Sequence, residues 1–173
     1  LGLQQAGVHD LTAATTDQLT AAGNFLADAV AQTDARFTDD GAEEGLPEKT
    51  FAVHQAWSGD LISAVISYLP EGTPPTVLSY WYQQAGGPIF NDCICVAAKA
   101  TKPVIAHRFL NYLLDNKVSY ENFTGYVGYQ TPLTAIDAQK LFDDGVVPKT
   151  LDQAVVTREA YANGNAYLTL SAK

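Results

Sequence analysis

The feature that most constrains the fold is a strand-like run that stops at a Ser-Gly step and continues as a helix. Residues 51–57 are predominantly apolar and aromatic, which is typical of a strand. Apolar residues then recur on one helical face at Leu61, Ile62, Val65, Ile66 and Leu69. Ser58 is the expected N-cap, and Asp60 lies in the first turn, where a carboxylate suits the helix dipole. The pattern predicts a strand-turn-helix unit.

The rest of the chain repeats this alternation of extended and helical segments. Thr15 and Gln18 form a capping box that opens a helix reaching Thr33. Turns rich in Pro and Gly precede two further expected strands, residues 77–83 and 89–97. Further helices are expected at about 103–113, 118–123 and 135–142. The predicted fold class is therefore α/β.

Charge limits the partners that such a chain can bind. Lys and Arg number 10 against 19 Asp and Glu, which gives a formal net charge of -9. This balance repels phosphate backbones and attracts cations, so nucleic acid is not an expected partner. No run approaches the roughly 20 apolar residues of a membrane-spanning helix.

The two cysteines, Cys93 and Cys95, are two positions apart in an apolar run. In a strand both would point to one face, where the geometry for a disulfide between them is poor. The three histidines show no spacing that completes a metal site. We expect two buried thiols, no metal and no cofactor.

Enzyme signatures are absent from the sequence. It contains no glycine-rich phosphate loop, no Gly-x-Ser-x-Gly and no His-Glu-x-x-His. Ser58, Asp60 and His54 could suggest a hydrolytic triad, but a helix cap explains Ser58 more simply. We expect a protein that is not an enzyme, with a Ser58-dependent hydrolase as the alternative from another class and a protein-interaction module as a third.

Aromatic residues lie close to carboxylates at the ends of expected strands and turns. Trp57 precedes Asp60, and Phe90 precedes Asp92. Aromatic faces attract ammonium groups and cover methylenes, while carboxylates neutralise the buried charge. This pairing predicts a site for an organic cation.

Four segments occur together in order. They are Trp57-Ser58-Gly59-Asp60, Gly86-Gly87-Pro88-Ile89-Phe90-Asn91-Asp92, the helix from Ala106 to Leu114, and Gly128-Tyr129-Gln130-Thr131-Pro132. Over residues 51–142 the chain resembles the second half of periplasmic spermidine/putrescine-binding proteins, the solute-binding proteins of ABC-type polyamine importers.

The resemblance implies particular ligand-binding residues. Trp57 matches an aromatic residue lining the polyamine slot, and Phe90 with Asp92 matches an aromatic-x-Asp pair that packs on methylenes and takes an ammonium. Phe90 occupies a position where the family usually has Trp, so the resemblance does not determine which polyamine is preferred. Tyr129 matches a pocket tyrosine, and Tyr167 matches a polar ligand residue near the end of the chain.

The resemblance also implies an architecture and a cellular role. The expected fold is one lobe of a type II periplasmic binding protein plus a return segment of the other lobe. Residues 1–88 would form the second lobe, 89–128 the return segment and 129–173 a C-terminal stretch packing back, with the first lobe upstream of residue 1.

The implied function is capture of putrescine or spermidine and delivery to an ABC permease. The protein would be periplasmic or anchored at the cell surface, with its signal sequence outside this chain. An alternative within the class is the same scaffold binding a different small solute. Without first-lobe strands to pair with, residues 89–97 would expose an edge, which favours a homodimer of the chain.

Overall fold

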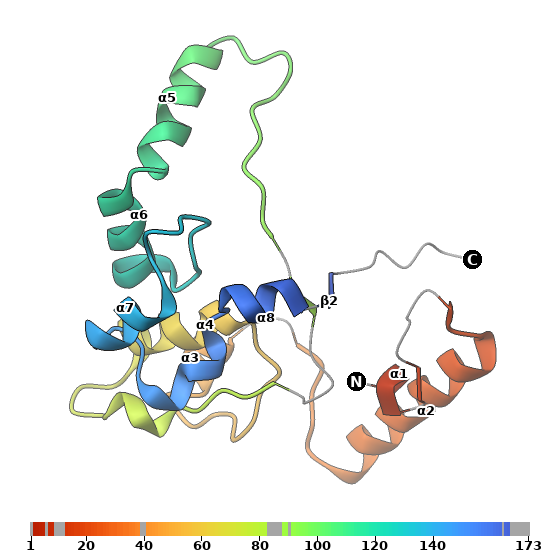
Figure 1. The fold of residues 1–173 in the computed structure, drawn as a ribbon. Helices are drawn as coiled ribbons and strands as arrows, with labels where there is room; N and C mark the ends of the chain where they lie inside the picture. Colours follow the sequence, from red (N-terminus) through yellow and green to blue (C-terminus); the bar gives the residue numbers. More distant parts are fainter. Residues whose placement is uncertain are drawn as a thin grey trace. The chain divides into compact units, whose positions relative to one another are not determined.

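The computed structural model describes residues 2–5, 7–8, 13–38, 41–82, 88–89, 91–163 and 165–166 (Figure 1). The chain divides into two compact units. The first comprises Leu1–Thr38 with Ala166–Lys173, and the second comprises Asp39–Asn165.

The first unit is built on two helices, α1 (Gly2–Gln5) and α2 (Thr16–Gln32). The expected capping box opens α2 and is confirmed: the Gln18 N–H donates to Thr15 Oγ1 at 3.3 Å, and the Thr15 N–H donates to Gln18 Oε1 at 2.9 Å. At Gly2 an added Cβ would lie 3.0 Å from the Ala22 carbonyl oxygen. The missing side chain therefore lets α1 approach α2 closely.

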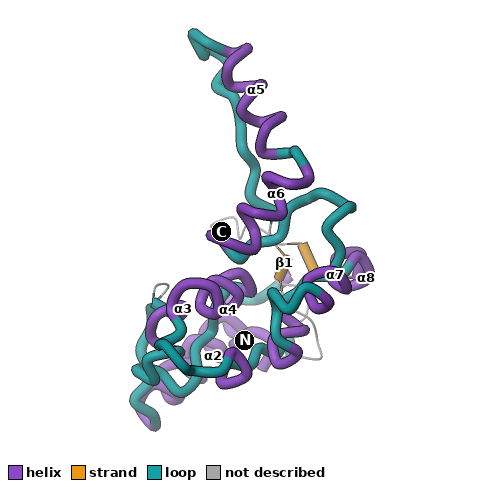
Figure 2. The backbone as a smooth tube through the Cα atoms, turned by 90° about the vertical axis from the view of Figure 1, so that its left-hand side faces the viewer, coloured by secondary structure: helices purple, strands orange, loops and turns teal. Residues whose placement is uncertain are grey.

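The second unit is a series of short helices (Figure 2). Its elements are α3 (Ala42–Gly45), α4 (Ser58–Ser63), η2 (Ala64–Tyr68), η3 (Pro75–Val77), β1 (Pro88–Ile89), α5 (Pro103–Leu113), α6 (Asn116–Asn122), η4 (Phe123–Val127), α7 (Ala138–Asp143), η5 (Lys149–Ala154) and α8 (Arg158–Asn163). α4 runs directly into the π-helical η2, and α6 runs into the π-helical η4. The expected helix beyond Ser58 is confirmed, although its N-cap is Trp57 rather than Ser58.

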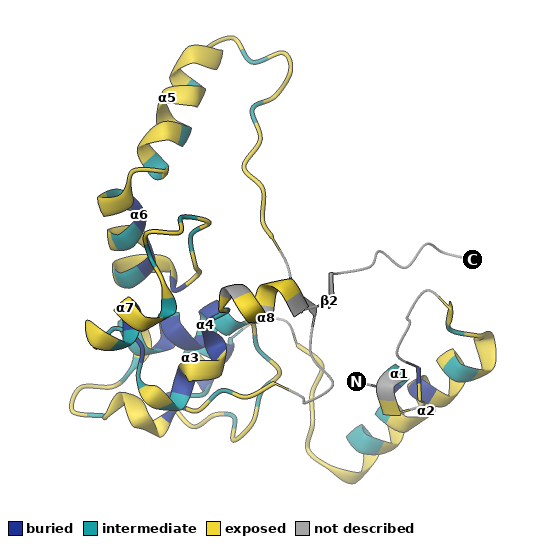
Figure 3. Cartoon of the chain, in the orientation of Figure 1, coloured by how far each residue is buried: buried dark blue, intermediate teal, exposed yellow. Residues whose placement is uncertain are grey.

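The core of the second unit lies where α4 meets η4, α7 and η5 (Figure 3). Its buried members are Leu61, Ile62, Ala64, Leu78, Phe123, Leu141, Val147, Leu151, Ala154 and Val155. The expected apolar face of 58–69 supplies Leu61 and Ile62 to this buried set, and its other members, Val65, Ile66 and Leu69, are partly buried against it. The hydrophobic periodicity therefore identified which side of this helix is buried.

Polar contacts also join α6 to α7. The Tyr120 hydroxyl donates to Asp144, and Lys140 Nζ lies 2.7 Å from Asp144 Oδ2. The same Nζ lies 4.9 Å from the centre of the Tyr120 ring. The ammonium lowers the pKa of Asp144 more than any other cause does, with the phenol second.

The predicted α/β class is wrong, and with it the lobe of a type II periplasmic binding protein. The part of the chain that the structure describes is mainly helical. Within the described part of the chain, regular strand is limited to β1 and β2 (Asn165–Ala166), which pair with each other over two residues each. Such a pair is not a central sheet. The division into segments at residues 88 and 128 stays a prediction.

The expected strands fail for a common reason. Residues 51–57, 91–97 and 78–82 have no regular secondary structure. In this last segment the Tyr80 N–H donates to the Thr150 carbonyl at 3.1 Å, and the Tyr82 N–H donates to Gln153 Oε1 at 3.1 Å. A strand needs a neighbour for its backbone groups, whereas a helix pairs them within itself.

Phe123 tests this account of the core, because its side chain is 1% exposed. Phe123→Ala should lower the free energy of unfolding by about 3–5 kcal/mol through lost burial and a residual cavity. Urea denaturation followed by circular dichroism measures the change. The matched control is Tyr126→Ala in the same helix, where the side chain is 74% exposed. Equal losses in the two variants would contradict the assigned core.

Candidate functional site

The candidate site is centred on Asp60, in the first turn of α4. Its Oδ1 accepts a hydrogen bond from the Tyr129 hydroxyl at 2.5 Å, and its Oδ2 accepts one from the Trp57 N–H at 3.2 Å. Asp60 also raises the pKa of Tyr80 electrostatically, after the larger effect of burial. We call Trp57, Asp60, Tyr80 and Tyr129 the Asp60 cluster. It brings three aromatic residues to one carboxylate.

Two glycines allow Tyr129 to reach Asp60. A Cβ added at Gly59 would lie 2.3–2.5 Å from the Tyr129 ring, so the ring occupies the space that a side chain would need. Gly128 has φ of 68°, and a Cβ there would lie 2.5 Å from the Gly59 carbonyl oxygen and 2.6 Å from the Ser63 nitrogen. The backbone before Tyr129 therefore lies directly against α4.

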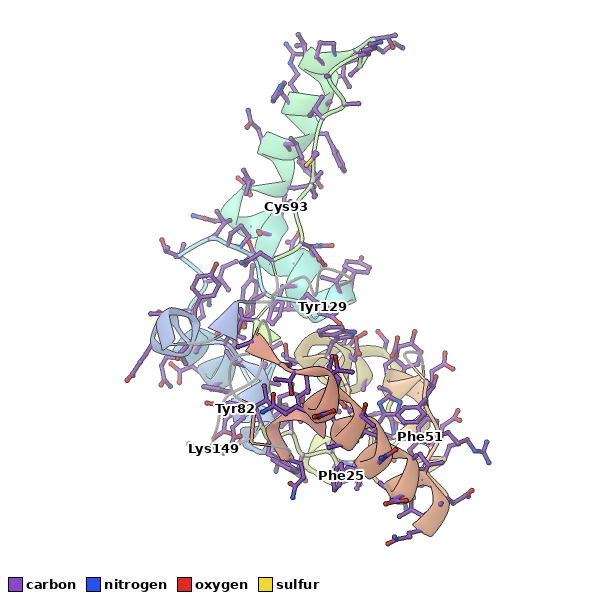
Figure 4. All side chains as sticks on the ribbon, turned by 90° about the vertical axis from the view of Figure 1, so that its right-hand side faces the viewer. Phe25, Phe51, Tyr82, Cys93, Tyr129 and Lys149 are labelled. Carbon is purple, nitrogen blue, oxygen red and sulfur yellow. The ribbon has the colours of Figure 1, made fainter. Side chains whose placement is uncertain are left out.

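The residues after Tyr129 are fixed by side-chain hydrogen bonds. Gln130 clamps the backbone of Val156: its Nε2 donates to the carbonyl at 3.2 Å, and its Oε1 accepts from the N–H at 2.7 Å. The buried Ser119 hydroxyl donates to Thr131 Oγ1 at 2.6 Å. These contacts position the whole segment, in which the Tyr129 hydroxyl donates to Asp60. Figure 4 labels Tyr129 among the side chains.

The electrostatic environment of Tyr129 is negative. Burial, the hydrogen bond to Asp60 and the charges of Asp60, Glu43 and Asp92 all raise the pKa of its phenol. The charged groups identified as acting on it are all carboxylates. Yet Tyr129 is 44% exposed and Trp57 is 49% exposed. The cluster thus presents open aromatic surface in a negative potential.

The structure brings together part of the expected site. Trp57 and Tyr129 both belong to the Asp60 cluster, and Asp92 is exposed within electrostatic reach of Tyr129. Phe90 and Tyr167 lie outside the described residues. The sequence pattern pairs Asp60 with Trp57, but it does not reveal the contact of Asp60 with Tyr129, which is 69 positions away, or the charge of Glu43 near Tyr129. The sequence does contain one indication of this contact, because a glycine directly precedes each of the two residues: Gly59 precedes Asp60, and Gly128 precedes Tyr129.

The hydrolytic alternative is not favoured by this geometry. Both Asp60 oxygens accept hydrogen bonds from Trp57 and Tyr129. His54 Nδ1 lies 2.9 Å from the carbonyl oxygen of its neighbour Gln55, and the imidazole lies against Phe51 with 5.1 Å between ring centres. A triad needs the acid to orient the base and the base to face the nucleophile. Here neither imidazole nitrogen bonds to Asp60 or Ser58, because His54 Nδ1 faces the Gln55 carbonyl and Nε2 has no partner.

The expectation of buried thiols is wrong. Cys93 and Cys95 are free and exposed, because the segment that carries them has no neighbouring strand. Within the described ranges, no group of three His, Cys, Asp or Glu side chains could hold a metal ion. In the same part of the chain, no helix is long and apolar enough to cross a membrane.

Comparison of the chain with protein-family models, curated proteins and solved structures gives no match.

Gly59→Ala tests the close packing at the site. The added methyl must displace the Tyr129 ring, so we expect a loss of about 1–3 kcal/mol in the free energy of unfolding, measured with urea. Gly125→Ala is the control, since a Cβ there meets nothing within 4 Å. In a Tyr129→Ala background the cost of Gly59→Ala should largely vanish. A cost that persists in that background would show that the ring is not what Gly59 accommodates.

The raised pKa of Tyr129 predicts a dependence of stability on alkaline pH. The unfolded phenol ionises near its ordinary value of 10.0, whereas the folded one holds its proton to higher pH. Its contribution is full below pH 10 and is lost as pH rises beyond that value. Urea unfolding between pH 8 and 11 should show this loss, and Tyr129→Phe should reduce it. Tyr126→Phe, which removes an exposed phenol, should leave the loss as in the unmodified chain. An identical pH profile for Tyr129→Phe and the unmodified chain would contradict the prediction.

Proposed function

We propose that this chain binds an organic cation of the polyamine class at the Asp60 cluster. One observation carries the proposal: the open aromatic surface of Trp57 and Tyr129 lies in a field produced by Asp60, Glu43 and Asp92. Ammonium groups seek carboxylates, and their methylenes seek aromatic faces. A net charge of -9 favours the approach of such a ligand from a distance.

Asp60 retains the capacity to bind an ammonium. A carboxylate has about four lone-pair sites, and two on Asp60 accept hydrogen bonds within the chain. The exposed Asp92 offers a second carboxylate, which suits a ligand with two ammonium groups. The two charges near one aromatic surface favour a diamine or triamine over a monoamine.

The cellular role that we propose is capture of putrescine or spermidine for delivery to an ABC permease on the outer side of a membrane. Its support is the order of four sequence segments, two of which supply the Asp60 cluster with Trp57, Asp60 and Tyr129. A different small cationic solute would use the same groups. No covalent step is part of this role.

Binding to the chain should be weak and saturable. Trp57 is half exposed, so a ligand stays solvated on one side, and we expect a dissociation constant in the millimolar range, about -4 kcal/mol. The second tryptophan, Trp81, is 68% exposed and is replaced by Phe so that fluorescence reports Trp57 alone. Spermidine is titrated at constant ionic strength, with NaCl as the reference.

Carboxylate variants test the assignment. Asp92→Asn removes an exposed charge and should weaken spermidine binding several-fold, and Asp60→Asn should weaken it tenfold or more. Glu71→Gln, an exposed carboxylate in another turn, is the control and should leave binding unchanged. Circular dichroism confirms that each variant is folded. Binding that survives both aspartate substitutions, or a fluorescence change that NaCl reproduces, would refute the proposed site.

A further inference from the structure

The most exposed apolar part of the molecule is the arm, which we define as residues 93–114. It consists of an extended segment followed by α5, and none of its residues is buried. Exposed side chains on it are Ile94 at 67%, Val104 at 65%, Ile105 at 60%, Phe109 at 56%, Tyr112 at 58% and Leu114 at 50%. Both backbone views show α5 extending away from α4, α6 and α7 (Figures 1 and 2).

The apolar surface of the arm is large enough to form a substantial part of an interface. From the exposed fractions, and about 100 Å² for an aliphatic and 200 Å² for an aromatic side chain, the arm leaves on the order of 500 Å² of apolar surface open. A standard interface needs about 800 Å² from each partner. In a reciprocal dimer each copy contributes both an arm and a surface that receives the partner's arm. The apolar surface of the arm alone is then more than half of the interface area that each copy must supply.

The charge of the arm identifies the kind of surface that receives it. The arm carries Lys99, Lys102 and Arg108 and contains no Asp or Glu. The rest of the chain has seven Lys and Arg against nineteen Asp and Glu. Two arms packed against each other would repel, whereas an arm on the acidic remainder of another copy is attracted.

We propose that the chain forms a two-fold symmetric homodimer in which each arm lies against the acidic body of the other copy. The body here means residues 41–82 and 115–163. The contact is self-complementary, as two-fold symmetry requires, because each copy presents one basic apolar arm and one acidic body. An anionic membrane could also attract a basic apolar helix, but the net charge of -9 repels such a surface. The proposal does not rest on ligand binding at the Asp60 cluster, whose members lie in the body and not in the arm.

Sedimentation equilibrium of the full chain tests the proposal over a range of concentrations and salt. We expect a mass of two chains at high concentration, with a dissociation constant that rises as NaCl rises. Ile105→Ser with Phe109→Ser, and separately Lys102→Glu with Arg108→Glu, should each raise the dissociation constant at least tenfold. Phe37→Ser removes a 77% exposed apolar side chain outside both the arm and the body and should leave the dimer unchanged. Because these arm residues are exposed within one copy, melting temperatures should stay constant when they are measured at concentrations where the unmodified chain is monomeric.

The cysteines give a second measurement, since Cys93 and Cys95 both lie in the arm and are exposed (Figure 4, Cys93 labelled). Their reaction with a thiol reagent should slow several-fold as the unmodified chain passes from monomer to dimer, and should not slow in the Ile105→Ser/Phe109→Ser variant. A monomer at all concentrations, or a dimer that both arm variants retain, would overturn the proposal. So would a chain that stays monomeric but sediments with phosphatidylglycerol vesicles in low salt.

Discussion

The arrangement of the second unit depends on the close approach of Gly128 to α4. With φ of 68° and no side chain, Gly128 lies against the backbone of Gly59, Ile62 and Ser63. A residue with a Cβ would both adopt an unfavourable backbone conformation and clash there. The contact sets where η4 ends and where the next residue, Tyr129, begins its path. This backbone contact brings the Tyr129 hydroxyl within hydrogen-bonding distance of Asp60.

The hydrogen bond between Tyr129 and Asp60 connects the packing of the second unit with the chemistry of the candidate site. Asp60 stabilises the start of α4 through the Trp57 N–H and holds the Tyr129 phenol with its other oxygen. The same carboxylate contributes to the negative potential to which Glu43 and Asp92 add. The same cluster therefore combines half-exposed aromatic side chains with an excess of negative charge. This combination is what an organic cation requires.

The arm presents the opposite chemistry on the same chain. Its exposed surface combines apolar side chains with three positive charges, while the remainder is strongly acidic. Its helix is well specified locally, since Pro103 occupies a first helical position and apolar residues recur at helical spacing. Local sequence signals can form a helix but do not bury it, and α5 has no buried residue. Because α5 forms from local sequence signals but stays exposed within one copy, we propose that a second copy covers it.

The sequence by itself determined the elements that depend on neighbours a few positions apart. The Thr15–Gln18 capping box, the helix after Ser58 with its buried face, and the helix after Pro103 all formed as expected, because helical hydrogen bonds and caps are local. The expected strands at 51–57, 77–83 and 89–97 depended on partners elsewhere in the chain, and the described parts of these segments form no central sheet. The exposure of the cysteines follows from the same lack of partners. Only the tertiary structure joined Tyr129 to Asp60 across 69 positions and placed Glu43 and Asp92 within their field. These contacts depend on how closely the backbone at Gly128 approaches the backbone at Gly59. The two glycines are far apart in the sequence, so no local sequence pattern predicts this approach.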